Sequence, residues 1–185
     1  LESLRYAFFQ VASIISTTGF ATADYVLWPQ LSRLVLVLLM FCGACAGSTG
    51  GGIKCSRVLM LLRAIRREIH QIAHPRSVEV VKLDGKVAEE STVHSVLVFV
   101  GCYGLILLGA ALVVSLDKMP FDVSFSAALT CLSNVGPGLA AIGPTGNFSG
   151  FSDLSKLALS LCMIVGRLEI FPILVMFSAR TWRRD

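Results

Sequence analysis

Charged residues are scarce in this sequence of 185 residues. Asp, Glu, Lys and Arg together make up 15% of it, whereas hydrophobic residues make up 55%, and the mean hydropathy is +0.75. A soluble domain typically carries about 25% charged and about 45–50% apolar residues. The composition therefore argues against a soluble enzyme, a disordered tail and a secreted disulfide scaffold. It predicts a helical membrane protein.

Long uncharged runs predict where the chain enters the membrane. Residues 95–116 contain no charge, and a span needs about 20 residues. A second apolar run, residues 34–46, ends at a glycine-rich segment, and a third, residues 157–179, is broken only by Arg167 and Glu169. Two further runs are too short to span and predict re-entrant or core helices. They are residues 6–15 and 123–132.

Positive charge gathers in two places. Eight of the 16 Lys and Arg residues lie between Lys54 and Lys86, and three more lie close to the C-terminus. Cytoplasmic segments of membrane proteins carry an excess of Lys and Arg, so both regions are predicted to face the cytoplasm. Acidic residues interleave with the first group, which argues against a nucleic-acid partner. Residues 74–92 hold a proline, a glycine and charges of both signs, and predict a cytoplasmic linker.

The sequence also contains an internal repeat. Ser16 and Gly19 recur 117 residues later as Ser133 and Gly136. Each pair follows a short apolar segment and precedes a polar connection and a longer apolar helix. The second copy has a spanning helix before it, residues 95–116, and the first copy lacks one.

This order is typical of a helix–pore-loop–helix unit. Residues 16–20 (S-T-T-G-F) and 133–137 (S-N-V-G-P) lie where each short helix would turn back. Non-helical backbone at membrane depth is tolerated only where it is buried in protein or lines water. Glycine permits backbone angles that direct successive carbonyls toward one axis, and a ring of carbonyls replaces the hydration shell of a monovalent cation. The alternative is a duplicated helical bundle whose glycine turns only cap re-entrant helices.

Residues 47–52 (G-S-T-G-G-G) predict a break in the long helix after the first copy. Each glycine inside a helix costs about 1 kcal/mol relative to alanine. We interpret the break as a movable plug under the predicted filter, with a passive helix kink as the alternative. A nucleotide-binding loop is not favoured, because Ile53 stands where the phosphate-binding lysine is required.

Arg167 lies inside an apolar run, where a charge is costly unless it faces protein or water. We predict that it faces the pore and pairs with the glycine-rich segment. The alternative is a structural ion pair between helices. The predicted gating residues are Gly47, Ser48, Thr49, Gly50, Gly51, Gly52, Lys54 and Arg167.

At these positions the sequence resembles the superfamily of TrkH and KtrB potassium transporters, and most of all the TrkH family. Residues 16–20 resemble the third filter sequence of that family and residues 134–138 the fourth. Residues 47–54 resemble its intramembrane gating loop, and residues 166–171 its last helix, which carries a pore-facing arginine. The resemblance covers essentially the whole chain.

The resemblance implies much of the functional interpretation. Members of the family fold four such units around one pore with pseudo-fourfold symmetry, form homodimers, and bind a cytoplasmic, nucleotide-binding regulatory subunit of the TrkA type. Potassium is then the transported substrate, and no covalently bound cofactor is expected. The filter residues that the resemblance implies are Thr17, Thr18, Gly19, Asn134, Val135 and Gly136.

We therefore expect an all-α integral membrane protein of helix–pore-loop–helix units, multi-pass in the lipid of the bacterial plasma (inner) membrane. Residues 1–73 are predicted to be a third unit without its first helix, residues 74–92 a linker, and residues 93–185 a complete fourth unit. Because the chain opens inside an apolar helix without methionine, we expect it to belong to a longer polypeptide. The expected function is gated potassium translocation without catalytic residues. A membrane enzyme subunit and a purely structural bundle are the alternatives.

Overall fold

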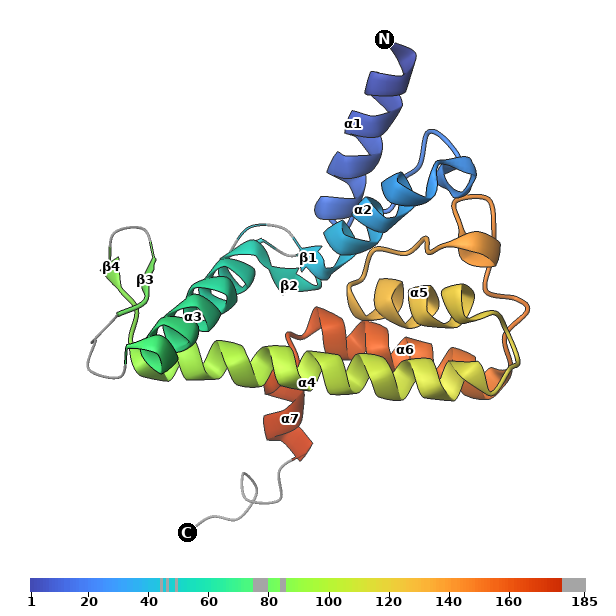
Figure 1. The fold of residues 1–185 in the computed structure, drawn as a ribbon. Coiled ribbons are helices and arrows are strands. Elements are labelled where there is room, and N and C mark those ends of the chain that lie inside the picture. The colour runs from blue at the N-terminus through green and yellow to red at the C-terminus, as the bar shows by residue number, and fades with distance from the viewer. Residues whose placement is uncertain (44, 46, 49, 75–79, 84–85, 178–185) are drawn as a thin grey trace.

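The computed structural model describes residues 1–185 except 44, 46, 49, 75–79, 84–85 and 178–185 (Figure 1). Helices dominate these residues, and each of the strands is two residues long. The elements in chain order are α1 (Glu2–Ile15), η1 (Tyr25–Leu27), α2 (Gln30–Phe41), β1 (Cys42–Gly43), β2 (Ile53–Lys54), α3 (Cys55–Ala73), β3 (Lys82–Leu83), β4 (Lys86–Val87), α4 (Glu90–Ser115), α5 (Phe121–Leu132), η2 (Ala140–Ile142), α6 (Asp153–Arg167) and α7 (Phe171–Phe177).

Helix α4 is the one helix among the described residues that is long and apolar enough to cross a membrane. It begins at Glu90 rather than at Ser95, because Glu90 enters the first helical turn and pairs with Arg67 of α3. An acidic side chain is also favourable near the positive end of a helix dipole. Helices α2 and α5 are apolar but shorter, so a multi-pass topology remains a prediction.

The core lies around α5, which packs against both α4 and α6 (Figure 1). Nine of the 12 residues of α5 are buried. Phe41 at the end of α2 brings the first half of the chain onto this core, with its ring centroid 6.3 Å from that of Tyr103 and 6.4 Å from that of Phe125. Residues from both copies of the sequence repeat therefore share one hydrophobic core.

Helix α1, in contrast, extends away from the rest of the molecule (Figure 1). Its buried residues are Gln10, Ser13 and Ile14, all close to its C-terminal end. The side chain of Phe8 is 74% exposed. Only the end of α1 that leads into residues 16–20 is therefore fixed by packing.

The long helix after the first copy breaks earlier than the glycine-rich segment predicts. Helix α2 ends at Phe41, where β1 pairs in parallel with β2 and Gly43 aligns with Lys54. A Cβ at Gly43 would lie 2.1 Å from the carbonyl oxygen of Gly51. The break is thus fixed by this close pairing as well as by the glycines that follow.

The described part of the apolar run 157–179, residues 157–177, forms two helices rather than the single helix that its composition suggests. Helix α6 ends at Arg167, and Glu169 follows in the left-handed region with a φ of 57°. The Ile170 amide donates to the Val165 carbonyl at 3.1 Å, which is the Schellman pattern of a helix end. Pro172 is the physical reason, because its ring would clash with the carbonyl of residue 168 in a continuous helix.

Candidate functional site

The first turn (residues 16–20) closes the C-terminal end of α1 with a Schellman motif. The Thr17 amide donates to the Ile14 carbonyl at 3.0 Å, and the Thr18 amide donates to the Ser13 carbonyl at 2.9 Å. Thr17 has a φ of 54°. A β-branched residue is a genuine outlier in this left-handed region, so the backbone of the first turn is strained at Thr17.

The second turn (residues 133–137) repeats this geometry at the end of α5. The Asn134 amide donates to the Cys131 carbonyl at 3.2 Å, and the Val135 amide donates to the Thr130 carbonyl at 3.0 Å. Asn134 has a φ of 57°. Each of these donors and acceptors lies 117 residues after its counterpart in the first turn, so the offset of the sequence repeat holds for the backbone hydrogen bonds.

A side-chain hydroxyl secures the far end of each turn in the same way. The Ser13 hydroxyl donates to the Phe20 carbonyl at 2.6 Å, and the Thr130 hydroxyl donates to the Pro137 carbonyl at 3.1 Å. The hydroxyl group is the feature that the two residues share. Each turn is therefore held at both ends by its own short helix.

The two turns meet at Gly19. A Cβ on Gly19 would lie 2.1 Å from the carbonyl oxygen of Val135, and Gly19 has a φ of +78°. Gly136, with a φ of +106°, has open space where a Cβ would lie. Glycine is thus required at position 19 by backbone angle and by space, and is favoured at position 136 by backbone angle alone.

Two buried tyrosines brace the second turn from different elements. Tyr103 of α4 shares a hydrogen bond of 2.7 Å with the Ser133 hydroxyl, and Tyr25 of η1 donates to the Gly138 carbonyl at 2.9 Å. Burial, together with Asp24 nearby, raises the pKa of the Tyr25 phenol well above its ordinary value. Tyr25 therefore remains a hydrogen-bond donor at physiological pH, and sequence reasoning did not single out either tyrosine.

Helix α6 also contacts the second turn. The Asn134 side-chain amide donates to the Met163 carbonyl at 3.2 Å. A Cβ on Gly166 would lie 1.8 Å from the carbonyl oxygen of Leu132. Gly166 therefore lets the backbone of α6 approach the end of α5, which explains the glycine in the last turn of this helix.

The glycine segment (residues 47–52) lies against the second turn. A Cβ on Gly51 would be 2.3 Å from the Ser133 carbonyl oxygen and 3.0 Å from the Asn134 Cβ. Gly47 and Gly52 have φ values of +83° and +75°. These residues surround Ser48 and Gly50, whereas Thr49 lies outside the described residues. The predicted gating segment is thus in direct contact with the predicted filter.

Glu169 joins the two helix breaks. Its carboxylate pairs with the Lys54 amine and accepts from Nη2 of Arg57 at 2.9 Å. The Arg57 guanidinium lies 4.0 Å from the centre of the Phe99 ring. Sequence reasoning missed this role of Glu169, because its partners lie more than 100 residues earlier in the chain. Only the unexpected acid in the apolar run pointed to it.

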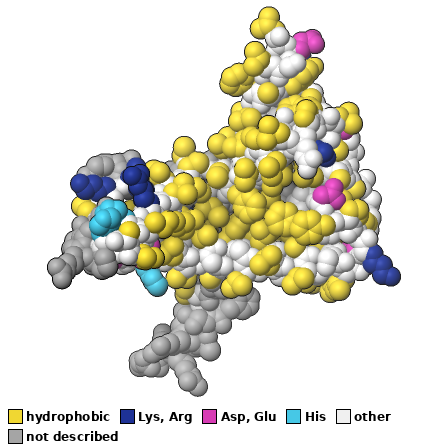
Figure 2. All heavy atoms as spheres, in the orientation of Figure 1, with side chains coloured by type: hydrophobic (Ala, Val, Ile, Leu, Met, Phe, Trp, Pro, Cys, Tyr) yellow, Lys and Arg dark blue, Asp and Glu magenta, His cyan; other side chains and the backbone are white. Residues whose placement is uncertain are grey.

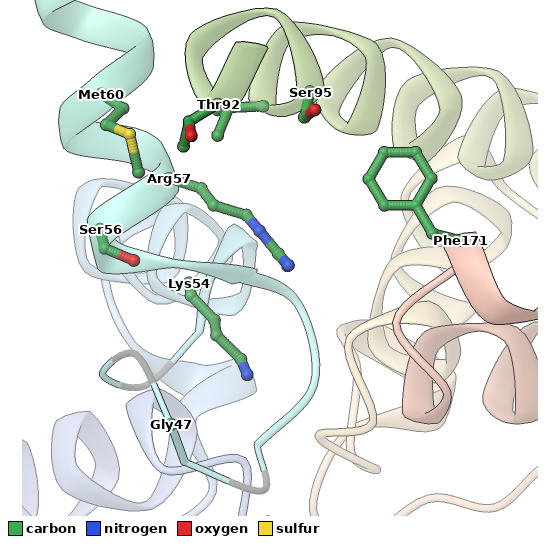
Figure 3. Close-up of a pocket in the computed structure, with 9 residues that line it drawn as sticks. Gly47, Lys54, Ser56, Arg57, Met60, Thr92, Ser95 and Phe171 are labelled. Carbon is green, nitrogen blue, oxygen red and sulfur yellow. The ribbon is translucent and has the colours of Figure 1, made fainter. Parts of the chain in front are cut away.

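Lys54 and Arg57 point into a cavity of about 320 Å³ between α3, α4 and α7 (Figure 3). Arg167 lines a different hollow, of about 410 Å³, together with Asn134 and Leu168. The structure therefore places Arg167 beside a predicted filter residue. Its pairing with the glycine segment remains a prediction.

These features define a helical membrane protein in which two short helices end in matching turns that meet. The family model of TrkH, described as a cation transport protein, matches residues 2–184. The chain belongs to the TrkH family, and neither the family description nor the names of the relatives below describe an enzyme.

Individual relatives agree with the family. The Trk system potassium uptake protein TrkH of Salmonella typhimurium is 35% identical over 183 residues, which cover 99% of this chain and 38% of that protein. TrkG of Escherichia coli, also a Trk system potassium uptake protein, is 36% identical over 98% of this chain and 37% of that protein. The chain thus spans less than two fifths of the length of these relatives.

A solved structure supports the fold. The crystal structure of the potassium transporter TrkH from Vibrio parahaemolyticus superposes with a TM-score of 0.89 at 35% identity, over 98% of this chain and 38% of that one. The expected class, a helical membrane transport protein, is confirmed by this likeness and by the family.

Proposed function

We propose that this chain contributes two of the pore-lining turns of a potassium-translocating protein in the bacterial plasma membrane. The observation that carries this proposal is the meeting of the two turns at Gly19 and Val135. Both turns follow a helix whose C-terminal end carries partial negative charge. The C-terminal ends of α1 and α5 both lead into the place where the two turns meet. Their partial negative charges favour a cation there and would be unfavourable for an anion.

The backbone of each turn supports this role. The amides of Thr17 and Thr18 donate back into α1, and those of Asn134 and Val135 donate back into α5. The amides are therefore occupied within each helix, whereas a carbonyl oxygen has two lone pairs and can accept again. We assign potassium coordination to the carbonyls of Thr17, Thr18, Asn134 and Val135. In this proposal Gly19 and Gly136 shape the strands.

The competing function, a structural bundle with glycine-capped helices, explains less. The left-handed capping position of each helix is occupied by Thr17 and Asn134, not by a glycine. Glycine is the usual residue at this position, and a simple cap would have no need for a strained threonine. Strained backbone is more common at functional sites than elsewhere, which favours the ion-coordinating role.

For the gate, we propose that the glycine segment moves against the second turn. The close approach of Gly51 to Ser133 supports this proposal, because the second turn is the proposed filter. A segment rich in glycine can also hold two arrangements of similar free energy. Arg167 would repel cations below the filter. Glu169 would anchor the segment through Lys54.

Four units around a pseudo-fourfold axis, a homodimer and a cytoplasmic regulatory subunit of the TrkA type are further parts of this proposal. The chain supplies two units, residues 1–73 and 93–185, joined by a linker at residues 74–92. The four-unit pore, the homodimer and the regulatory subunit are supported by the family membership and by the names of the relatives as potassium uptake proteins.

The decisive experiment compares Gly136→Ser, Gly19→Ala and the control Gly101→Ala in full-length protein reconstituted in liposomes. Gly136→Ser should lower the ratio of potassium to sodium flux about tenfold, because a left-handed backbone costs a side chain roughly 1–2 kcal/mol. Gly19→Ala should lower this flux ratio further, because the added methyl group would also collide with the carbonyl oxygen of Val135. Gly101→Ala, which meets open space in α4, should keep the wild-type ratio. A wild-type ratio in both turn variants would refute the filter assignment.

A further inference from the structure

Helix α3 carries an apolar stripe that no described element covers. Leu62, Ile65, Ile69 and Ile72 are 59%, 46%, 63% and 81% exposed. Their spacing of three and four residues places them on one face of the helix. The excess of Lys and Arg in this part of the chain predicts that it lies at the cytoplasmic side of the membrane.

A basic pocket lies beside this stripe. Arg63, Arg66 and Arg67 of α3 and Lys82 of β3 line a hollow of about 220 Å³, together with two valines. Figure 2 shows Lys and Arg side chains gathered at this end of the molecule, next to a broad hydrophobic surface. Arg66 is four residues after Leu62, and therefore neighbours the apolar stripe on the helix surface.

The pocket has more positive charge than its neighbours neutralise. Arg67 pairs with Glu68 and Glu90, and Arg63 donates to the Lys82 carbonyl, which carries no charge. Among the described residues, four cations stand against these two acids, an excess of two positive charges. No ion-pair partner for Arg66 occurs among the described residues.

One donor in the pocket also lacks an acceptor. The Arg67 side chain is 12% exposed. Its Nε atom is buried and has no hydrogen-bond partner within the described part of the chain. A buried donor without an acceptor is unfavourable, and such groups are often satisfied by a bound ion or water.

We propose that this pocket binds the headgroup phosphate of an anionic phospholipid of the cytoplasmic leaflet, with the acyl chains lying along the stripe of α3. A phosphate oxygen matches the planar guanidinium groups, and basic pockets on the cytoplasmic side of membrane helices bind such headgroups. A free anion would use the cations alone. The adjoining stripe favours a lipid because it offers apolar surface where the chains would lie.

A local probe tests this in the full-length protein. A bimane fluorophore on a single cysteine introduced by Ile72→Cys, in a protein without its other cysteines, reports which lipid lies beside α3. In phosphatidylcholine vesicles with a minority of phosphatidylglycerol, brominated phosphatidylglycerol should quench bimane more than brominated phosphatidylcholine does. The variant Arg66→Gln should reduce this preference about fivefold, since each basic residue near an anionic surface contributes about that factor to binding.

Matched variants make the test specific. Arg66→Lys keeps the charge and should retain most of the preference, and Lys118→Gln, which removes a cation outside the pocket, should retain all of it. Because Arg66 is exposed, its replacement should leave the thermal transition of the protein unchanged. Arg63→Gln combined with Arg66→Gln should remove the preference.

Three results would overturn the proposal. Equal quenching by the two brominated lipids would show that the pocket does not select charge. Loss of the preference on adding inorganic phosphate would assign the pocket to a soluble anion. An unchanged preference in the double variant, with binding of a cytoplasmic protein lost instead, would make the patch a protein-docking surface.

Discussion

Helices α1 and α5 end in turns with matching Schellman hydrogen bonds, yet their surroundings differ. Nine of the 12 residues of α5 are buried, whereas three of the 14 residues of α1 are. Helices α4 and α6 both pack against α5, and within the described residues nothing takes the place of α4 beside α1. The capping hydrogen bonds of each turn are therefore formed between the short helix and the residues just after it.

The largest expected effect tests whether α1 is also covered in the full-length protein. Leu129 in α5 is fully buried, and Leu129→Ala should destabilise the protein by about 2–5 kcal/mol. If four units surround one pore, another helix covers α1, and Phe8→Ala should then cost about 3 kcal/mol. Thermal unfolding of the purified full-length variants in detergent measures both changes.

The control for this comparison is Phe121→Ala, because Phe121 is 81% exposed at the start of α5. Its effect should stay within about 0.5 kcal/mol. If Phe8→Ala changed stability as little as this control, α1 would remain uncovered in the whole protein. The four-unit arrangement would then be contradicted.

A smaller effect is expected from the ion pairs of Glu169, which connect the two proposed units. Glu169→Gln removes the negative partner of Lys54 and Arg57, so the glycine segment should be held less firmly and basal potassium flux should rise severalfold. Lys54→Gln should have a similar effect. The double variant should show less than the sum of the two, because both changes break one interaction.

Additive effects of these two variants would show that the pair does not act as a unit. Lys156→Gln is the matched control, since Lys156 pairs with an exposed acid at 3.8 Å and is itself 43% exposed. Exposed pairs contribute little, about 0–1 kcal/mol. The potassium flux of Lys156→Gln should therefore equal that of the wild type.

The smallest expected effect concerns the start of the long helices. Ser152 caps α6 by accepting from the Ser155 amide at 3.3 Å, whereas α2 begins without a side-chain cap. Ser152→Ala should therefore destabilise α6 by about 1 kcal/mol. Exchange of the amide hydrogens in the first turn of α6 would measure this change, with α2 as the internal reference.

Asp117 makes the stability of the first turn of α6 depend on pH. Hydrogen bonds from Ser152 lower the pKa of the Asp117 carboxyl. Its contribution is therefore present above the ordinary pKa of aspartate and is lost as the pH falls through the lowered value. In acid, the amide hydrogens in the first turn of α6 should exchange at the same rate in Asp117→Asn and in the wild type. At neutral pH they should exchange faster in Asp117→Asn. A difference between them that stayed constant with pH would contradict this link.

The ends of α1 and α5 could be predicted from the sequence, because the matched Ser16 and Ser133 mark local turns. The end of α2 at Phe41 could not, since it depends on pairing between β1 and β2 across residues 44–52. The division of the last apolar run had a signal in Pro172 that composition alone concealed. Composition weighs residues by hydropathy, whereas a proline acts through one missing donor and one clash.

The candidate site divides in the same way. Gly19 and Gly136 were identified because the repeat placed them at equal positions, and the structure shows that their surroundings differ. The bracing tyrosines and the partners of Glu169 come from elements far away in the chain. No periodicity or motif links such residues, so only the folded chain brings them together.

The connections after the two turns differ in length, and this has a practical consequence. Helices α1 and α5 end 117 residues apart, whereas α2 and α6 begin 123 residues apart. The second connection thus holds six more residues, while the two Schellman hydrogen bonds of its turn match those of the first turn. Ser149 and Gly150 are exposed there. A peptide tag inserted between them would provide a handle for labelling or purification that leaves both turns intact.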